Sequence, residues 1–311
     1  MGQSTLSTQE LAAMFTVTET TIKRWADCGK IPCTKTLGGH RKFLMRDVIA
    51  FAEHHHYEIP GVLPANGSRR EQEQIEIAIL TKNYARLSER LRMKAMHGDS
   101  AGVFDLLLCC SRHHLPLFRI TDEIIRPAMA RIGELWMSNE IEINQEHRAS
   151  HAVMEGIIRL APELHRKTAN GRTAICACPE GEYHEIGLRC LAVSLESEGW
   201  NVEYLGANTP FTTLASFLRP SKADLVCLSA TFDDLQDGRA GQFRDFGAVC
   251  RSFGVTLTCG GLFLRKYPKE ELGCDFIGET LTGILQFVRD RFGLRPGPKK
   301  NSEAGVPANN H

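Results

Sequence analysis

The chain has 311 residues, 42% of them hydrophobic, which is enough for two or three domains that each bury a core and which excludes an intrinsically disordered protein. Its 37 Lys and Arg residues balance 37 Asp and Glu residues, so any nucleic-acid surface must be a local patch rather than a property of the whole chain. The cysteines form no Cys-x-x-Cys pair and no apolar run approaches the roughly 18 residues of a membrane span, so we expect a reduced, cytoplasmic protein.

The first segment, residues 1–58, has the pattern of a helix-turn-helix. Ser7 and Glu10 have the spacing of a capping box, which satisfies the unpaired amides at a helix start. A second helix is predicted after a tight turn, with Val17, Ile22 and Trp25 spaced so that they pack back on the first helix.

The charge on this segment indicates phosphate contact. Residues 23–46 contain seven basic residues and a single acid, Asp27. Three of the basic residues follow a predicted turn at Gly38-Gly39. This order resembles the MerR-type winged helix-turn-helix domain, whose second helix enters the major groove and whose wing touches the backbone. A winged helix that binds protein is the alternative. The resemblance implies double-stranded operator DNA as the partner, with groove contacts from Thr18, Thr20, Thr21, Lys23 and Arg24 and wing contacts from His40, Arg41 and Lys42.

Two segments of different composition follow. Residues 59–70 are rich in Pro, Gly, Asn and Ser without periodicity, which is typical of a flexible linker and would let the first domain move independently. Residues 71–168 carry apolar residues at helical spacing and predict a four-helix bundle. The long heptad helix with which ordinary MerR proteins dimerise is missing from this pattern, so we expect a homo-dimer or homo-tetramer to assemble through the later domains.

Residues 169–293 have the pattern of an α/β domain with a doubly wound parallel sheet. Three apolar runs, residues 172–178, 225–231 and 255–261, read as buried neighbouring strands that end in small residues. In such sheets ligands bind outside the carboxyl ends of the strands. The tail, residues 294–311, has a disordered composition.

The stretch after the first of these strands contains a candidate metal ligand. His184 lies where a strand gives way to a helix, and Glu182 could accept a hydrogen bond from its ring, as carboxylates do for metal-bound histidines. Gly187 would let a ligand approach the backbone closely. Taken alone, a loop histidine beside a glutamate is more often a solvated surface feature.

The spacing of this stretch relative to the later strands is more specific. An acid, any residue, His, two residues and Gly are followed after 41 residues by Ser-x-Thr and after another 28 by Gly-Gly. This pattern resembles the cobalamin-binding domain of methionine synthase and its relatives. The resemblance implies that His184 is the lower ligand of cobalt, that Glu182 stands where the family usually has aspartate, and that the nucleotide tail occupies a slot lined by Ser229, Thr231, Gly260 and Gly261.

A second spacing lies in the predicted bundle. Trp136 is followed by nine residues and then by Glu146-His147, which resembles the helical cap of cobalamin-dependent photoreceptor repressors of the CarH type. The resemblance implies that Trp136 packs on the upper axial group, with Glu146 and His147 hydrogen-bonding near it. In that family a histidine after the tryptophan takes the upper cobalt site once light removes the adenosyl group. Met137 stands here instead, and a thioether is a weaker donor to cobalt(III), so His147, His151 or water could fill the site.

The sequence therefore predicts a multidomain, non-enzymatic repressor that binds adenosylcobalamin, or another cobalamin form, and operator DNA, without membrane contact. Light would break the Co–C bond, change the oligomeric state and release DNA. A light-independent cobalamin sensor is the alternative that Met137 supports. A cobalamin-dependent enzyme module is disfavoured because a substrate barrel needs about 250 residues. A metal-sensing regulator is weakened by unclustered cysteines, and the pairs Cys28–Cys33 and Cys176–Cys178 and the run 54–56 are more consistent with structural positions.

Overall fold

The computed structural model describes residues 5–15, 17–36, 38–44, 47, 48, 51, 52, 69–231, 239–262, 264 and 267–294. The chain divides into two compact units, Met1–Gln74 and Ile75–His311, here called unit 1 and unit 2. The predicted linker up to residue 68, the run 54–56 and the predicted tail beyond residue 294 lie outside the described residues. No helix in the described part is long and apolar enough to cross a membrane.

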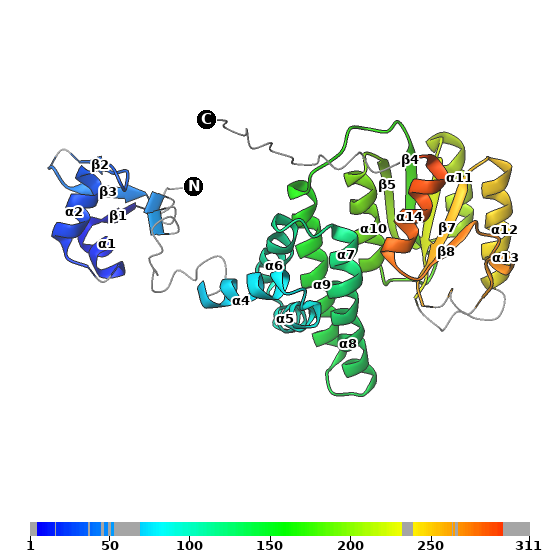
Figure 1. Cartoon of the computed structure of the whole chain (residues 1–311), viewed down its shortest axis with the longest axis horizontal. Coiled ribbons are helices and arrows are strands. Elements are labelled where there is room, and N and C mark those ends of the chain that lie inside the picture. Colours follow the sequence, from blue (N-terminus) through cyan, green and yellow to red (C-terminus); the bar gives the residue numbers. More distant parts are fainter. Residues whose placement is uncertain are drawn as a thin grey trace, which may run out of the picture. The chain divides into compact units, whose positions relative to one another are not determined.

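Unit 1 is a small helix-turn-helix body with a three-stranded antiparallel sheet in the order β1-β3-β2 (Figure 1). The predicted capping box is formed, because the Ser7 hydroxyl accepts from the amide of Glu10 and the Glu10 carboxylate accepts from the amide of Ser7. The aromatic rings of Phe15, Trp25 and Phe51 pack against one another in the core. Its described elements are β1 (Thr5–Ser7), α1 (Thr8–Met14), α2 (Glu19–Asp27), β2 (Thr34–Lys35) and β3 (Arg41–Leu44).

Unit 2 begins with helices, which form its helical half. The predicted four-helix bundle is present, and it is preceded by helix α4, whose residues up to Gln74 belong to unit 1. One of the four long helices is interrupted by a π-helical turn, η1, between α7 and α8. Asn83 and Asp99 cap two of the helices through their side-chain oxygens. The elements are α4 (Arg69–Leu80), α5 (Tyr84–Met96), α6 (Ser100–Arg112), α7 (Leu117–Ile120), η1 (Thr121–Ile125), α8 (Arg126–Met137), α9 (Ile143–Leu160) and the 3-10 turn η2 (Ala161–Glu163).

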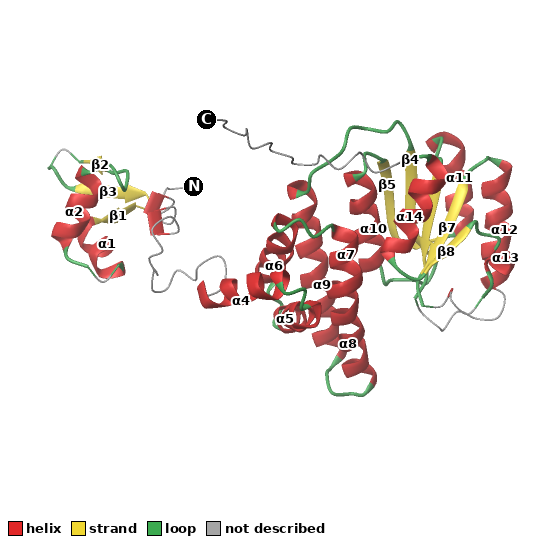
Figure 2. Ribbon diagram, in the orientation of Figure 1, coloured by secondary structure: helices red, strands yellow, loops and turns green. Residues whose placement is uncertain are grey.

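The sheet half of unit 2 is a doubly wound parallel sheet in the order β5-β4-β6-β7-β8, with helices on both faces (Figure 2). The three strands predicted as neighbours, β4, β6 and β7, are adjacent in this order. The chain leaves β4 toward β5 on one side and continues from β6 on the other, which places the switch point between β4 and β6. The elements are β4 (Thr173–Pro179), α10 (Ile186–Ser197), β5 (Asn201–Thr209), α11 (Phe211–Ser221), β6 (Leu225–Ser229), α12 (Arg239–Ser252), β7 (Thr256–Gly260), α13 (Lys269–Leu272), β8 (Phe276–Gly278) and α14 (Leu281–Phe292).

The two halves of unit 2 share a hydrophobic core. Leu188 of α10 and Ile284 of α14 belong to the same buried cluster as Ile124 and Val153 of the helical half. The other face of the sheet has a separate core, in which α11 and α12 pack. Helices α10 and α14 are therefore the layer that joins the bundle to the sheet.

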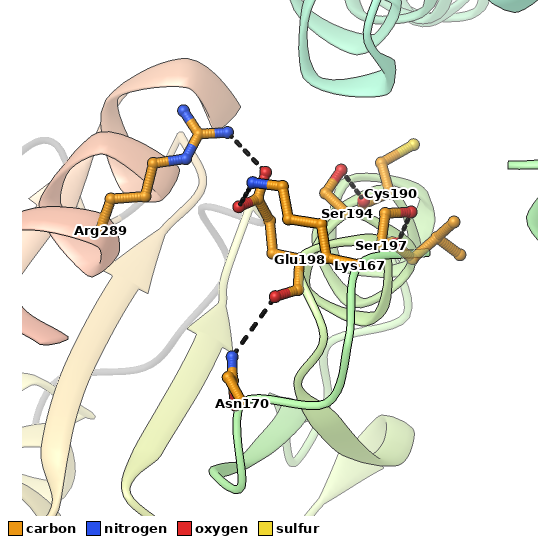
Figure 3. A network of polar contacts seen from close by, with 8 residues as sticks. Lys167, Asn170, Cys190, Ser194, Ser197, Glu198 and Arg289 are labelled. Carbon is orange, nitrogen blue, oxygen red and sulfur yellow. Dashed lines mark hydrogen bonds and ion pairs between the residues drawn. The ribbon is translucent and has the colours of Figure 1, made fainter. Parts of the chain in front are cut away.

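A network of hydrogen bonds and ion pairs connects α10 and α14 at the carboxyl end of α10. The Glu198 carboxylate accepts from Lys167 Nζ at 2.5 Å and from Arg289 at 2.8 Å, and Asn170 donates to the Glu198 carbonyl (Figure 3). Burial on its own would raise the pKa of Glu198, but the hydrogen bonds from Arg289 and Lys167 outweigh it and lower that pKa. The network fixes the segment between the two halves to both α10 and α14.

Candidate functional site

The segment between β4 and α10, residues 180–185, is called the ligand loop. Its centre is the Glu182 side chain, which is fully buried. One carboxylate oxygen of Glu182 accepts from the His184 amide and from His184 Nδ1, both at 2.7 Å, and the other accepts from the amide of Thr231, just after β6. Because a buried carboxylate is stable only when donors surround it, these three hydrogen bonds fix the loop and the imidazole together.

The His184 imidazole lies at the surface above this buried carboxylate. Its side chain is 51% exposed, and Nδ1 is the nitrogen that donates to Glu182, so Nε2 is on the opposite edge of the ring. The hydrogen bond to Glu182 raises the pKa of His184, while burial acts in the opposite sense. A histidine with a carboxylate on one nitrogen and the other directed away is the arrangement of many metal ligands.

A residue that the sequence analysis missed holds the ligand loop from β5. The Asn208 side chain accepts from the amide of Gly181 at 2.8 Å, and the Asn208 amide donates to the Glu182 carbonyl at 3.0 Å. Asn208 has a φ of +54°, a left-handed conformation that asparagine adopts more readily than most residues. An asparagine at the end of a strand was the available signal, but its partner lies 27 residues away.

A second unpredicted group lies beside the loop. The Tyr204 hydroxyl of β5 donates to the Glu185 carboxylate at 2.8 Å, and the Arg189 guanidinium stacks on the Tyr204 ring at 3.4 Å from its centroid. Burial and the hydrogen bond to Glu185 raise the pKa of Tyr204. This group anchors the first turn of α10, and therefore the end of the ligand loop, to the edge strand.

The predicted slot residues lie at the carboxyl ends of two adjacent strands. Ser229 of β6 pairs in register with Gly260 of β7. Gly261 has a φ of +109°, and a Cβ there would lie 2.1 Å from the Ala230 carbonyl oxygen, so the fold itself requires this glycine. At Gly187, by contrast, a Cβ would meet no atom within 4 Å. Open space at the start of α10 is what close approach of a ligand needs.

The predicted cap residues lie at the end of α8 and the start of α9. Trp136 and Met137 are 38% and 70% exposed. The Glu146 carboxylate accepts from Ser150 Oγ at 2.6 Å, and His147 Nε2 lies 3.7 Å from it. The charge of Glu146 also contributes to the raised pKa of His184, so the start of α9 and the ligand loop are within electrostatic range of each other.

The predicted DNA-contact residues of unit 1 fall into two groups. On α2, Thr20, Lys23 and Arg24 are exposed, whereas Thr18 is the N-cap and accepts from the amide of Thr21. On the wing, His40 is exposed and Lys42 is half-buried in β3. Arg41 is only 17% exposed at its side chain and pairs with Asp27 at 2.5 Å. This ion pair joins β3 to the end of α2, and DNA contact by Arg41 stays a prediction.

Comparison with known families accounts for both units. Residues 172–282 match a family model described as a B12 binding domain, and residues 87–161 match a second model of the same description. Together the two matches cover most of unit 2. Residues 5–56 match a helix-turn-helix domain. The ligand loop, the strand ends of the slot and the end of α8 all lie within the B12-binding matches.

Individual relatives agree with this assignment. The chain is 29% identical over 196 residues to the HTH-type transcriptional repressor CarA of Myxococcus xanthus, which covers 62% of each chain. It is 32% identical over 116 residues to the repressor CarH of the same organism, covering 37% of this chain and 38% of that one. The chain thus spans about 62% of the length of CarA. The expected resemblance to regulators of the CarH type is confirmed.

The fold has a match among solved structures. The monomethylamine corrinoid protein of Methanosarcina barkeri superposes with a TM-score of 0.57 at 20% identity, covering 67% of this chain and 99% of that protein. This likeness concerns the fold of the B12-binding domain, a helical cap followed by a parallel sheet with helices. It supports the predicted fold class for unit 2.

Proposed function

We propose that this protein is a transcriptional repressor whose hold on operator DNA depends on adenosylcobalamin and is released by light. The observation that carries the proposal is the buried Glu182 carboxylate that orients His184 at the carboxyl ends of the strands, in the same chain as a helix-turn-helix. The proposed domains are a DNA-binding domain (1–58), a linker (59–70), a helical cap (71–168), a cobalamin domain (169–293) and a tail (294–311).

The residues of the candidate site fit this cofactor. His184 presents one nitrogen to Glu182 and the opposite edge of the ring outward, which suits a lower cobalt ligand. The open space at Gly187 suits the approach of the corrin, and the strand ends at Ser229 and Gly260 suit a buried nucleotide tail. Trp136 offers an exposed aromatic face to the upper side. When bound, adenosylcobalamin supplies a Co–C bond that visible light breaks.

In this proposal the helical half couples the light-driven loss of the adenosyl group to DNA binding. Trp136 would lie against the bound cofactor in the dark, with Glu146 and His147 beside it. Loss of this contact in the light would remove what favours one packing of the helical half against α10. Assembly through these surfaces then shifts, and DNA binding by several helix-turn-helix units loses its avidity.

A second candidate function rests on Met137. This side chain is 70% exposed at the end of α8, where the related photoreceptors carry histidine, and its thioether is a poor ligand for cobalt(III). The second candidate is therefore a regulator that reports cobalamin without a light response. A methyl-carrier or mutase module is less well supported, because a helix-turn-helix would have no role in such a module.

The test uses the purified full chain loaded with adenosylcobalamin, kept dark and then illuminated. We expect a histidine-ligated spectrum in the dark, a spectral change in light, and a simultaneous loss of oligomer mass and operator affinity. A dark oligomer that binds cofactor and does not respond to light would favour the sensor. Failure of the chain to bind cobalamin would overturn both.

A further inference from the structure

Three potential metal ligands converge in the helical half, away from the ligand loop. A carboxylate oxygen of Glu76, Cys109 Sγ and a ring nitrogen of His113 all lie within 4.8 Å of one another. Glu76 is on α4, Cys109 is on α6, and His113 is the residue that ends α6. The cluster therefore joins α4 to α6, which are separated in the chain by α5.

The local structure explains why two of these donors face the same way. Cys109 and His113 are four residues apart, and residues at that spacing lie one above the other on a helix. The His113 amide also donates to the Cys109 carbonyl at 3.1 Å, so the helical turn continues to this residue. Cys109 is buried at 7% exposure, while His113 is exposed and Glu76 is half-buried.

The chemistry of the set selects the class of ion. Thiolate, imidazole and carboxylate are the three side-chain donors that zinc uses, whereas calcium and magnesium take oxygen ligands. Donor atoms around tetrahedral zinc are roughly 3.5 Å apart, given metal–ligand distances of about 2.0–2.3 Å. The present separations, all within 4.8 Å, exceed that value by at most about 1.3 Å. We infer that Glu76, Cys109 and His113 form a Zn²⁺ site with a fourth position for water.

The site gives α4 a second attachment to the bundle. Helix α4 buries Ile75, Ala78 and Ile79, whereas Ile77 and Leu80 are 55% and 72% exposed, so it packs through one narrow face. A bond from Glu76 through zinc to α6 fixes the rotation of α4 about that face. Zinc binding does not depend on cobalamin, and its test is independent of the proposed repressor function.

The experiment is calorimetric titration of the metal-stripped full chain with Zn²⁺, for the wild type and a matched pair of variants. His113→Asn removes a ligand. His114→Asn changes the neighbouring exposed histidine, whose φ of +62° asparagine tolerates. We expect one high-affinity zinc per chain, an affinity at least about tenfold lower in His113→Asn, and no change in His114→Asn.

Two further measurements distinguish zinc binding at this cluster from zinc binding by other histidines on the surface. Cys109→Ala should lower the affinity as His113→Asn does, whereas Cys110→Ala, at a buried cysteine outside the cluster, should not. Zinc should also slow amide hydrogen exchange in α4 of the wild type but not of His113→Asn. The inference is overturned if no zinc binds tightly, if both histidine variants behave alike, or if zinc raises the mass by bridging two copies.

Discussion

Asp122 and Thr282 are separated by 160 residues and share two hydrogen bonds, in which the Asp122 carboxylate accepts from the Thr282 amide at 2.9 Å and from its hydroxyl at 2.6 Å. The same carboxylate accepts from the Leu281 amide at 2.8 Å. Asp122 lies in the π-helical turn η1 of the helical half, and both donors belong to the first turn of α14. A side chain of the helical half therefore accepts hydrogen bonds from the amides at the start of α14, a helix of the sheet half.

Asp122→Ala should weaken the packing of the helical half against the sheet half of unit 2. The substitution leaves the buried amide of Leu281 and the part-buried amide of Thr282 without their acceptor, which should lower the free energy of unfolding by about 2–3 kcal/mol. Chemical denaturation measures this change, and hydrogen exchange should speed up in α14. Asp99→Ala is the matched control, because Asp99 caps α6 from within the helical half. It should destabilise the chain and leave exchange in α14 unchanged; equal exchange in both variants would contradict the role of Asp122.

Glu182→Gln should weaken cobalamin binding while the fold is retained. An amide can still accept from one donor, but it lacks the charge that holds the His184 imidazole as a hydrogen-bond donor. Loss of such a partner typically costs about 10- to 100-fold in metal affinity, measurable by absorbance titration with adenosylcobalamin. Glu185→Gln is the control, since Glu185 contacts Tyr204 rather than the imidazole. A similar loss in both variants would show that the effect is general to the loop.

Lys23→Ala should reduce DNA affinity through electrostatics alone. Each phosphate contact that is lost should decrease the slope of log affinity against log salt by about 1. Fluorescence anisotropy with operator DNA over a salt series measures this slope. Arg41→Ala should behave differently, because Arg41 pairs with Asp27 and its loss should lower the melting temperature of unit 1. If Lys23→Ala leaves both affinity and slope unchanged, α2 is not the helix that meets phosphate.

Acid should weaken the Glu198 network. The pKa of Glu198 in the folded protein lies below its ordinary value of 4.5, so its contribution to stability is present above that pH and is lost as the pH falls through the folded pKa. Glu198→Gln should cost about 1–2 kcal/mol at neutral pH and less in acid. Denaturation at a series of pH values measures the difference, and a constant difference across the series would rule out titration of Glu198 as its source.

The sequence was sufficient where the determinants are local. The Glu182–His184 pair spans two residues, the Ser7–Glu10 capping box spans three, and three strands of the sheet are continuous apolar runs. No apolar run predicts the edge strand β5, because its first four residues alternate between exposed and half-buried. Contacts such as Asp122–Thr282 and Arg41–Asp27 join residues far apart in the chain, and no local pattern predicts which residues the fold brings together. The charge of Arg41 predicts DNA contact, which stays a prediction, and only the structure shows that Arg41 also pairs with Asp27.

Met137→His should distinguish the two candidate functions. Met137 is 70% exposed, so the substitution should leave the core intact, and it supplies an imidazole directly after the tryptophan. If the protein is a photoreceptor with a weakened end state, the illuminated variant should form a longer-lived adduct with a bis-histidine spectrum, because imidazole is a far better donor to cobalt(III) than a thioether. Absorbance during and after illumination measures the lifetime. Met137→Leu is the control, since it keeps size and apolarity and removes the sulfur. A wild-type adduct as durable as that of the histidine variant, and unchanged in Met137→Leu, would mean that another group such as His147 or His151 already fills the upper site.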